Sequence, residues 1–198
     1  MDSFPSDLKA IPQDPYALFS QWYEAAERED PDCFNAVSLA TADQQGRPSN
    51  RMVLLKRYTQ QGFVFATNYE SRKGRELGAN PFGALLFWWS GLGRQVRIEG
   101  RVEKTDRSVS ESIFDERPRA SRWAAMASHQ SKPLQSRDSL LKRFESLSGT
   151  EPQCPPHWGG FLLRPEAFEF WIHVPSRLHD RVQFLWRDDG WQLSRLSP

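Results

Sequence analysis

Several cations and hydroxyls of this chain are grouped where secondary-structure elements are expected to begin or end. Ser71, Arg72 and Lys73 stand where a strand-like run ends and a helix-like run begins. The first turn of a helix presents free backbone N–H groups, so a hydroxyl and two cations placed there could hold a phosphate. The alternative is a capped surface helix whose Arg and Lys lie in water, and this motif alone does not separate the two.

A second pair of cations flanks an apolar strand-like run. Arg51 and Lys56 are five residues apart, which places them on opposite faces of a strand. In a barrel wall or at a dimer interface, opposite faces can contact two ligands or two ends of one ligand. The alternative is a pair of solvated charges on an edge strand.

A third group combines one strong cation with neutral hydrogen-bonding side chains. It consists of Arg117, Ser121, Ser128, Gln130 and Ser131. Such a mixture could bind a phosphate or the polar edge of a ring. Helix caps and a solvated arginine are the alternative interpretation.

The fourth group is RLHDR, residues 177–181. If this segment is a strand, Arg177, His179 and Arg181 lie on one face, and two cations flank an imidazole. Such groups repel one another unless an anion or an electron-rich ring lies between them. The segment is therefore predicted to face a ligand.

The overall composition limits what else the chain can be. Its 198 residues, 38% hydrophobic with a formal net charge of +1, are typical of one folded domain that has no global field to attract nucleic acid or membrane. No signal-like N-terminus and no run of about 18 apolar residues is visible, which predicts a cytoplasmic protein. Cys33 and Cys154 lack disulfide or metal spacing, the four histidines are scattered, and protease, kinase and Rossmann motifs are missing. We therefore expect no metal.

The elements that position these groups follow from the apolar pattern. An amphipathic helix is predicted from the N-cap Asp14 and Pro15, followed by five strand-like runs between residues 35 and 104 with one short helix at 70–80. Residues 107–147 predict two or three helices, and the tail predicts four more strands, the first two separated by Pro165. We expect an α+β fold, mainly β: an antiparallel barrel with peripheral helices over 14–198, after a flexible segment at 1–13.

The aromatic content points to a second copy of the chain. Eight Trp and thirteen Phe exceed what one small core requires, and the run Phe87-Trp88-Trp89 suggests a flat surface to be covered. A dimer would cover it, although an aromatic core is the alternative.

Together these segments resemble the pyridoxamine 5'-phosphate oxidases, dimeric FMN enzymes with a split-barrel fold. The resemblance runs from about Asp14 to Pro198, in order and with nearly unchanged spacing. It is carried by RMVLLK at 51–56, TNYESRKGREL at 67–77, RQVRIEGRVEK at 94–104, RPRAS at 117–121, SHQS at 128–131, WGGF at 158–161, EFW at 169–171, RLHDR and the terminal RLSP. It implies a homodimer in which 14–150 form the core barrel and helices and 151–198 form the dimerisation and substrate strands.

The resemblance also implies roles for individual residues, some of them contributed by the second subunit. The implied FMN-binding residues are Arg51, Met52, Val53, Leu54, Ala66, Thr67, Ser71, Arg72, Lys73, Gln95, Gln130, Ser131, Trp171 and Arg181. The implied substrate-binding residues are Lys56, Arg117 and Ser121 around a phosphate, with Arg177 and His179 over the pyridine ring as the catalytic pair.

The implied reaction is the oxidation of pyridoxamine or pyridoxine 5'-phosphate to pyridoxal 5'-phosphate. A hydride passes from the C4' carbon of the substrate to FMN, and O2 is reduced to hydrogen peroxide. Two alternatives remain: a flavin oxidase of the same fold that acts on another ring compound, as in phenazine biosynthesis, and a non-catalytic protein that binds FMN or pyridoxal phosphate.

Three departures from the family pattern bear on the substrate. Ile113 stands where the family has a tyrosine whose hydroxyl contacts the substrate phosphate. After Trp171 the family continues Gln-Gly, whereas this chain has the bulkier Ile172-His173-Val174-Pro175. The N-terminus lacks the Arg- and Tyr-containing segment that folds over the substrate in typical members.

Overall fold

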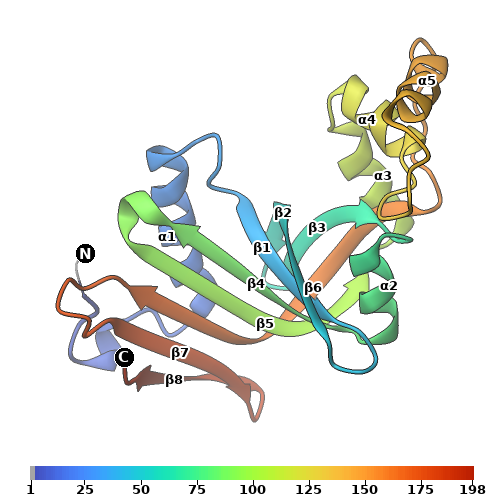
Figure 1. Ribbon diagram of the computed structural model, residues 1–198. Helices are drawn as coiled ribbons and strands as arrows, with labels where there is room; N and C mark the ends of the chain where they lie inside the picture. The colour runs from blue at the N-terminus through green and yellow to red at the C-terminus, as the bar shows by residue number, and fades with distance from the viewer. Residues whose placement is uncertain (1–2) are drawn as a thin grey trace.

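The protein, described here by a computed structural model over residues 3–198, is an antiparallel barrel with a two-stranded extension (Figure 1). The strands are β1 (Ala36–Ala42), β2 (Pro48–Thr59), β3 (Gly62–Asn68), β4 (Phe82–Trp89), β5 (Arg94–Lys104), β6 (Trp158–Ile172), β7 (Asp180–Arg187) and β8 (Gly190–Leu196). Their order in the sheet is β3-β2-β1-β4-β5-β6-β7-β8, and a further pairing of β3 with β6 closes the first six into a barrel. The predicted fold class is confirmed, with β6 supplying the strand that closes it.

One predicted boundary is wrong. Pro165 was expected to separate two strands, but β6 continues through it as a single strand of 15 residues. Proline cannot donate a ladder hydrogen bond, and the pairing of β5 with β6 shifts register between Glu99 and Gly100, where Pro165 is accommodated. A Cβ at Gly100 would lie 1.9 Å from the carbonyl oxygen of Arg164, so this close approach needs glycine.

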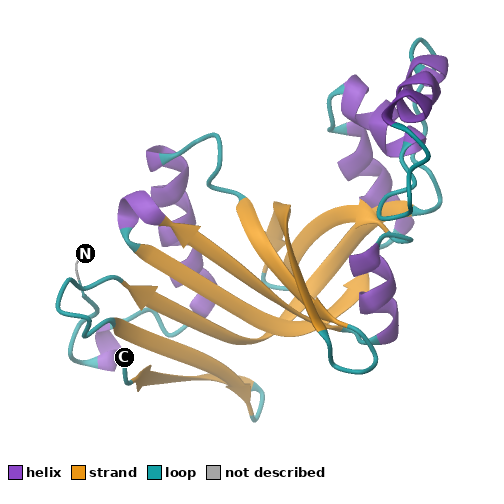
Figure 2. Ribbon diagram, in the orientation of Figure 1, coloured by secondary structure: helices purple, strands orange, loops and turns teal. Residues whose placement is uncertain are grey.

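The helices lie outside the barrel (Figure 2). They are α1 (Pro15–Glu29), α2 (Arg72–Ala79), α3 (Arg107–Asp115), α4 (Arg119–Ala127) and α5 (Arg137–Leu147), with short 3-10 turns at Leu8–Ala10 and Ser90–Leu92. The Asp14 cap, the Pro15 start and three helices between 107 and 147 are as predicted. α1 packs Phe19 and Trp22 against the barrel, where their rings contact Phe63 and Phe170.

The N-terminal segment lies against the barrel from residue 3 onward. Phe4 and Ile11 are buried, and Asp7 caps the first 3-10 turn. Of the segment 1–13 that was expected to be flexible, residues 1–2 lie outside the described part, and the remainder is anchored by the buried side chains of Phe4 and Ile11.

No helix among residues 3–198 is long and apolar enough to span a membrane.

Candidate active site

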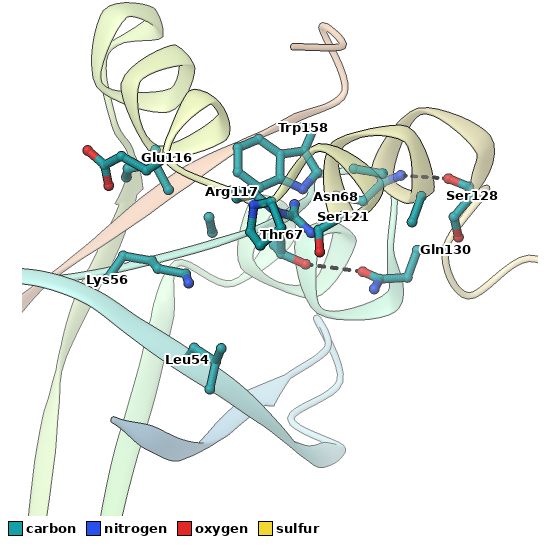
Figure 3. Close-up of a pocket in the computed structure, with 15 residues that line it drawn as sticks. Leu54, Lys56, Thr67, Asn68, Glu116, Arg117, Ser121, Ser128, Gln130 and Trp158 are labelled. Atoms are coloured by element: carbon teal, nitrogen blue, oxygen red, sulfur yellow. Dashed lines mark hydrogen bonds between the residues drawn. The ribbon is translucent and has the colours of Figure 1, made fainter. Parts of the chain in front are cut away.

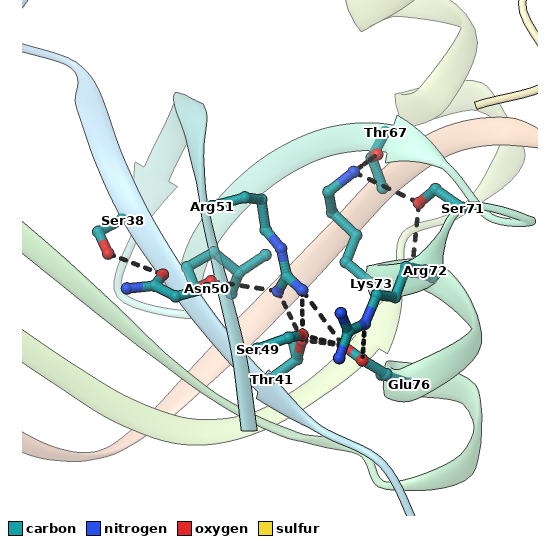
Figure 4. Close-up of polar contacts among 12 residues, drawn as sticks. Ser38, Thr41, Ser49, Asn50, Arg51, Thr67, Ser71, Arg72, Lys73 and Glu76 are labelled. Atoms are coloured by element: carbon teal, nitrogen blue, oxygen red, sulfur yellow. Dashed lines mark hydrogen bonds and ion pairs between the residues drawn. The ribbon is translucent and has the colours of Figure 1, made fainter. Parts of the chain in front are cut away.

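The start of α2 gathers a buried lysine and several neutral oxygens (Figure 4). The Nζ of Lys73 donates hydrogen bonds to Thr67 Oγ1 at 2.9 Å, to Gln130 Oε1 at 3.0 Å and to Ser71 Oγ at 3.3 Å. Only 8% of Lys73 is exposed. Burial, together with the nearby charge of Arg51, lowers the pKa of Lys73 to about 8.

A buried carboxylate that was not predicted from the sequence lies beside this lysine. Glu76 pairs with Arg51 at 3.2 Å and with Arg72 at 2.8 Å, and it accepts hydrogen bonds from Thr41 and Ser49. Burial opposes its ionisation, but these hydrogen bonds outweigh burial and lower the pKa of Glu76 to about 2. Glu76 therefore orients Arg51. In the sequence, Glu76 follows Arg72 by four residues on the predicted helix, and this spacing could have indicated an ion pair between them.

The charges of this group do not cancel. Arg51, Arg72 and Lys73 contribute three positive charges and Glu76 one negative charge, so the group carries two excess positive charges. Lys73 hydrogen-bonds only neutral oxygens among the described residues. This excess and a buried ammonium fit a bound phosphate dianion, the chemistry that FMN would bring.

Local packing fixes where α2 begins. Ser71 caps the helix by accepting a hydrogen bond from the Gly74 N–H. A Cβ at Gly74 would lie 2.2 Å from the Tyr69 carbonyl oxygen, so glycine lets the helix start directly against the end of β3. The first turn therefore remains beside Thr67.

A cavity of about 540 Å³ lies next to this group (Figure 3). Five residues that were predicted from the sequence as binding residues belong to its polar lining: Lys56, Thr67, Arg117, Ser121 and Gln130. Thr67 and Gln130 also contact Lys73. They therefore form the wall between the cavity and the cationic group, which consists of Arg51, Arg72, Lys73 and Glu76.

Two positively charged side chains, Lys56 and Arg117, face this cavity. Burial lowers the pKa of both Lys56 and Arg117, and the charge of Arg117 lowers that of Lys56 further. Glu116 also lines the cavity, and its charge partly offsets the lowering of the Lys56 pKa, although its carboxylate is paired with Arg57. Arg117 lies over the ring of Trp158, 4.9 Å from its centroid, and this contact holds the guanidinium at the cavity wall.

Ile113, which stands where the family has a tyrosine, lies at this cavity. Ile113 lines it, is 1% exposed and belongs to an apolar cluster with Phe114 and Trp158. This part of the wall therefore offers no hydroxyl to an anion.

Five of the residues predicted from the sequence form a second group at the other end of the barrel strands. Gln95 at the start of β5 pairs with Trp171 near the end of β6, and Trp171 pairs with Arg181 of β7. The buried Glu169 bonds Arg181 at 2.9 Å and Arg97 at 2.7 Å. The Trp171 ring lies 4.5 Å from that of His179.

The strand geometry predicted for RLHDR is wrong for its first half. β7 begins at Asp180, so Arg177 and His179 lie in the preceding turn, and Arg177 has a left-handed φ of 65°. His179 still turns toward Trp171 because its Nδ1 accepts a hydrogen bond from the Val174 N–H at 3.2 Å. In the neutral imidazole the proton is therefore on Nε2. The ring of His173 lies beside that of His179, with centroids 5.4 Å apart.

The two groups are far apart in one chain. β6 begins at Trp158, paired with Asn68 beside the cationic group, and reaches Trp171 thirteen residues later. An extended strand rises about 3.3 Å per residue, so roughly 40 Å of strand separates them. The two groups therefore lie at opposite ends of β6.

The other nominated residues lie around the first group. Met52 and Leu54 project from β2 and are 63% and 47% exposed, whereas the side chain of Val53 packs on the core. Ala66 lines the cavity. Ser131, with a φ of 67°, follows Gln130 in the loop after α4. Val53 can therefore contact a ligand on the outer face through its backbone but not through its side chain.

Family models match almost the whole of this architecture. One described as "Pyridoxamine 5'-phosphate oxidase" matches residues 24–150, and one described as "Pyridoxine 5'-phosphate oxidase C-terminal dimerisation region" matches residues 158–198.

Curated relatives and solved structures agree with those matches. Proteins named pyridoxine/pyridoxamine 5'-phosphate oxidase from Paraburkholderia xenovorans and Pseudomonas putida are 50% and 48% identical, over 97% and 94% of this chain and 92% and 90% of theirs. The structure of PhzG from Burkholderia lata, in complex with tetrahydrophenazine-1-carboxylic acid, superposes with a TM-score of 0.93 at 29% identity, covering 100% of this chain and 99% of that one. With relatives so similar over nearly its full length, the chain belongs to the pyridoxamine 5'-phosphate oxidase family of oxidoreductases.

Proposed function

We propose that the protein is an FMN-dependent oxidase of pyridoxine 5'-phosphate or pyridoxamine 5'-phosphate. The FMN phosphate is held by Arg51, Ser71, Arg72 and Lys73, where the group carries two excess positive charges. When bound, FMN accepts a hydride from the substrate and its electrons pass to O2, giving hydrogen peroxide. Met52 and Leu54, exposed on the neighbouring strand, offer apolar surface for its ring.

The observation that carries the choice of substrate is the pair of cations in the cavity. Lys56 and Arg117 face the same space as Ser121, and among residues 3–198 neither forms an ion pair with a carboxylate. Two cations and a hydroxyl match a second phosphate, distinct from that of FMN. This favours a phosphorylated ring substrate.

The second group completes the site from another copy of the chain. In a homodimer, Gln95, Trp171 and Arg181 of one subunit contact the flavin held by its partner, while Arg177 and His179 cover the substrate ring. The roughly 40 Å of strand between the groups, and the matched dimerisation region, support this arrangement.

The direct test uses the purified, FMN-loaded protein under air with pyridoxine 5'-phosphate. We expect pyridoxal 5'-phosphate and hydrogen peroxide in equal amounts, and little turnover of unphosphorylated pyridoxine. Lys56→Met should raise KM for the phosphorylated substrate and leave FMN bound. Lys104→Met, which removes an exposed lysine lying over the Tyr69 ring, is the control. A yellow protein that forms neither product would overturn the oxidase assignment.

Complementation tests the shared site. One chain carries Lys56→Ala, the other Arg177→Ala, and each homodimer has both sites impaired. A heterodimer has one site with both defects and one with none, so random mixing should restore about a quarter of the wild-type activity. No recovery on mixing would place both residues in the same subunit's site.

Two observations favour a different ring substrate. PhzG, whose structure superposes with a TM-score of 0.93, was solved with a phenazine carboxylic acid, and Ile113 removes a hydroxyl from the cavity wall. If pyridoxine 5'-phosphate is not oxidised, tetrahydrophenazine-1-carboxylic acid is the next compound to test. Flavin binding without oxidation of either would favour a carrier or sensor.

A further inference from the structure

The aspartate of RLHDR has no part in the site described so far. Asp180 is the first residue of β7, and its side chain is 12% exposed. One carboxylate oxygen accepts the backbone N–H of Phe4 at 2.7 Å, and the other pairs with Arg195 of β8. Asp180 therefore joins three segments that are far apart in the sequence.

The N-terminal side of this junction is anchored. The ring of Phe4 is 7% exposed and stacks on Trp22 of α1 at 5.7 Å. Arg195 donates a second hydrogen bond to the carbonyl oxygen of Pro5. The backbone of residues 4–5 is consequently fixed on both sides of the Asp180 carboxylate.

The turn before Asp180 is packed mainly through the rings of His173 and His179, which lie near Trp171. Leu178 is 70% exposed, Arg177 has a left-handed φ, and the turn is closed by hydrogen bonds from the Val174 N–H to His179 and from the Arg177 N–H to the Val174 carbonyl. Few buried contacts mean that such a turn opens easily unless its ends are held. His173 N–H bonds the Gly93 carbonyl at one end, and Asp180 holds the other.

We propose that Asp180 is a positioning residue: through Phe4 and Arg195 it fixes the turn that presents Arg177 and His179 to the substrate. The role assigned to those two residues rests on the proposed function, whereas the fixing of the turn does not. Asp180 itself touches no reacting group. Its loss acts by spreading the turn over several conformations, which reduces the fraction competent to bind.

The test compares Asp180→Ala with Glu103→Ala in the full-length, FMN-loaded protein. Glu103 pairs with Arg164 across β5 and β6, so the control also breaks a cross-strand ion pair, but away from the turn. Amide hydrogen exchange of residues 174–179 is measured together with KM, kcat and FMN affinity.

We expect Asp180→Ala to increase exchange in the turn and to raise KM about tenfold, with FMN affinity unchanged and kcat altered less than KM. Asp180→Asn, which keeps an acceptor for the Phe4 N–H, should recover part of the loss. Phe4→Ala should raise KM in the same direction because it frees the N-terminal anchor while leaving Asp180 in place.

Equal exchange in Asp180→Ala and the control would overturn the proposal, as would a fall in melting temperature with KM unchanged. If the wild-type protein oxidises neither substrate, the proposed function fails, but the exchange of residues 174–179 still decides whether Asp180 fixes the turn.

Discussion

The ammonium of Lys73 lies 3.0 Å from the side-chain oxygen of Gln130, 57 residues further along the chain. This bond joins the first turn of α2 to the loop after α4, and Thr67 donates to the same oxygen. The boundary between the cationic group and the neighbouring cavity is thus made by neutral polar groups. An anion on one side can stabilise Lys73 without cancelling the cations on the other.

Lys73 should make FMN binding dependent on pH. Its pKa is about 8 in the flavin-free protein, so the lysine loses its positive charge as the pH rises through 8. The affinity for FMN should therefore fall as the pH rises above about 8. Lys73→Met should weaken binding at least about tenfold, on the scale of a lost charge-assisted hydrogen bond, and should flatten the pH dependence. Fluorescence titration of FMN measures both. Lys132→Met, which removes a surface ion pair with Glu70, should change neither.

The same lysine should destabilise the flavin-free fold. Its pKa is lower in the folded protein than the ordinary 10.5, so folding opposes its charge at neutral pH, and stability from this group rises as the pH increases from about 8 to 10.5. Lys73→Met should therefore raise the melting temperature of the flavin-free protein at pH 7 while weakening FMN binding. A lower melting temperature would contradict this account.

Glu76 should control stability in acid. Its pKa is lowered from 4.5 to about 2, so its contribution is fully present above pH 4.5 and is lost as the pH falls toward 2. Glu76→Gln should cost about 3 kcal/mol at pH 7, since it leaves Arg51 without its buried partner. Denaturant unfolding between pH 2 and 7 measures this, and the variant should show a shallower decline below pH 4.5. Glu151→Gln, an exposed partner of Arg119, is the control.

Arg177 should affect turnover and leave the flavin in place. Arg177→Ala should lower kcat/KM by about 10- to 100-fold, as expected for one lost hydrogen bond to a charged group. Lys73→Ala should do the reverse and release flavin. Arg187→Ala, on the exposed end of β7, controls for loss of a cation. Loss of flavin from Arg177→Ala would place this residue in the cofactor site instead.

His179 should be an Nε2 donor when neutral. Its Nδ1 accepts the Val174 N–H, so 15N NMR should show the Nε2–H form of the neutral ring. His179→Gln places an amide near Nε2 and should retain more activity than His179→Asn, whose amide lies near Nδ1. A protonated Nδ1 in the neutral form, or better rescue by Asn, would exclude this assignment.

The sequence alone determined the local features of this protein. Capping at Asp14 and Ser71, the alternation in β2 and the turns between strands depend on neighbouring residues, so they could be predicted without the fold. The barrel class followed from the succession of short strands, and the family followed from motifs in order. Caps, alternation and turns arise from contacts and backbone preferences of residues that are close in the sequence.

Contacts between distant residues were decided by the tertiary structure. The carboxylate of Glu76 reaches Arg51 only because α2 lies against β1, the strand that pairs with β2. Pro165 continues a strand because the register of β5 shifts beside it. The period of two failed for Arg177 because the chain turns before β7, where Asp180 is held by Phe4, 176 residues away. The cavity shape and the separation of the two groups depend on which strands pair. Local periodicity indicates which face of a strand a residue takes, but it does not name the partner strand.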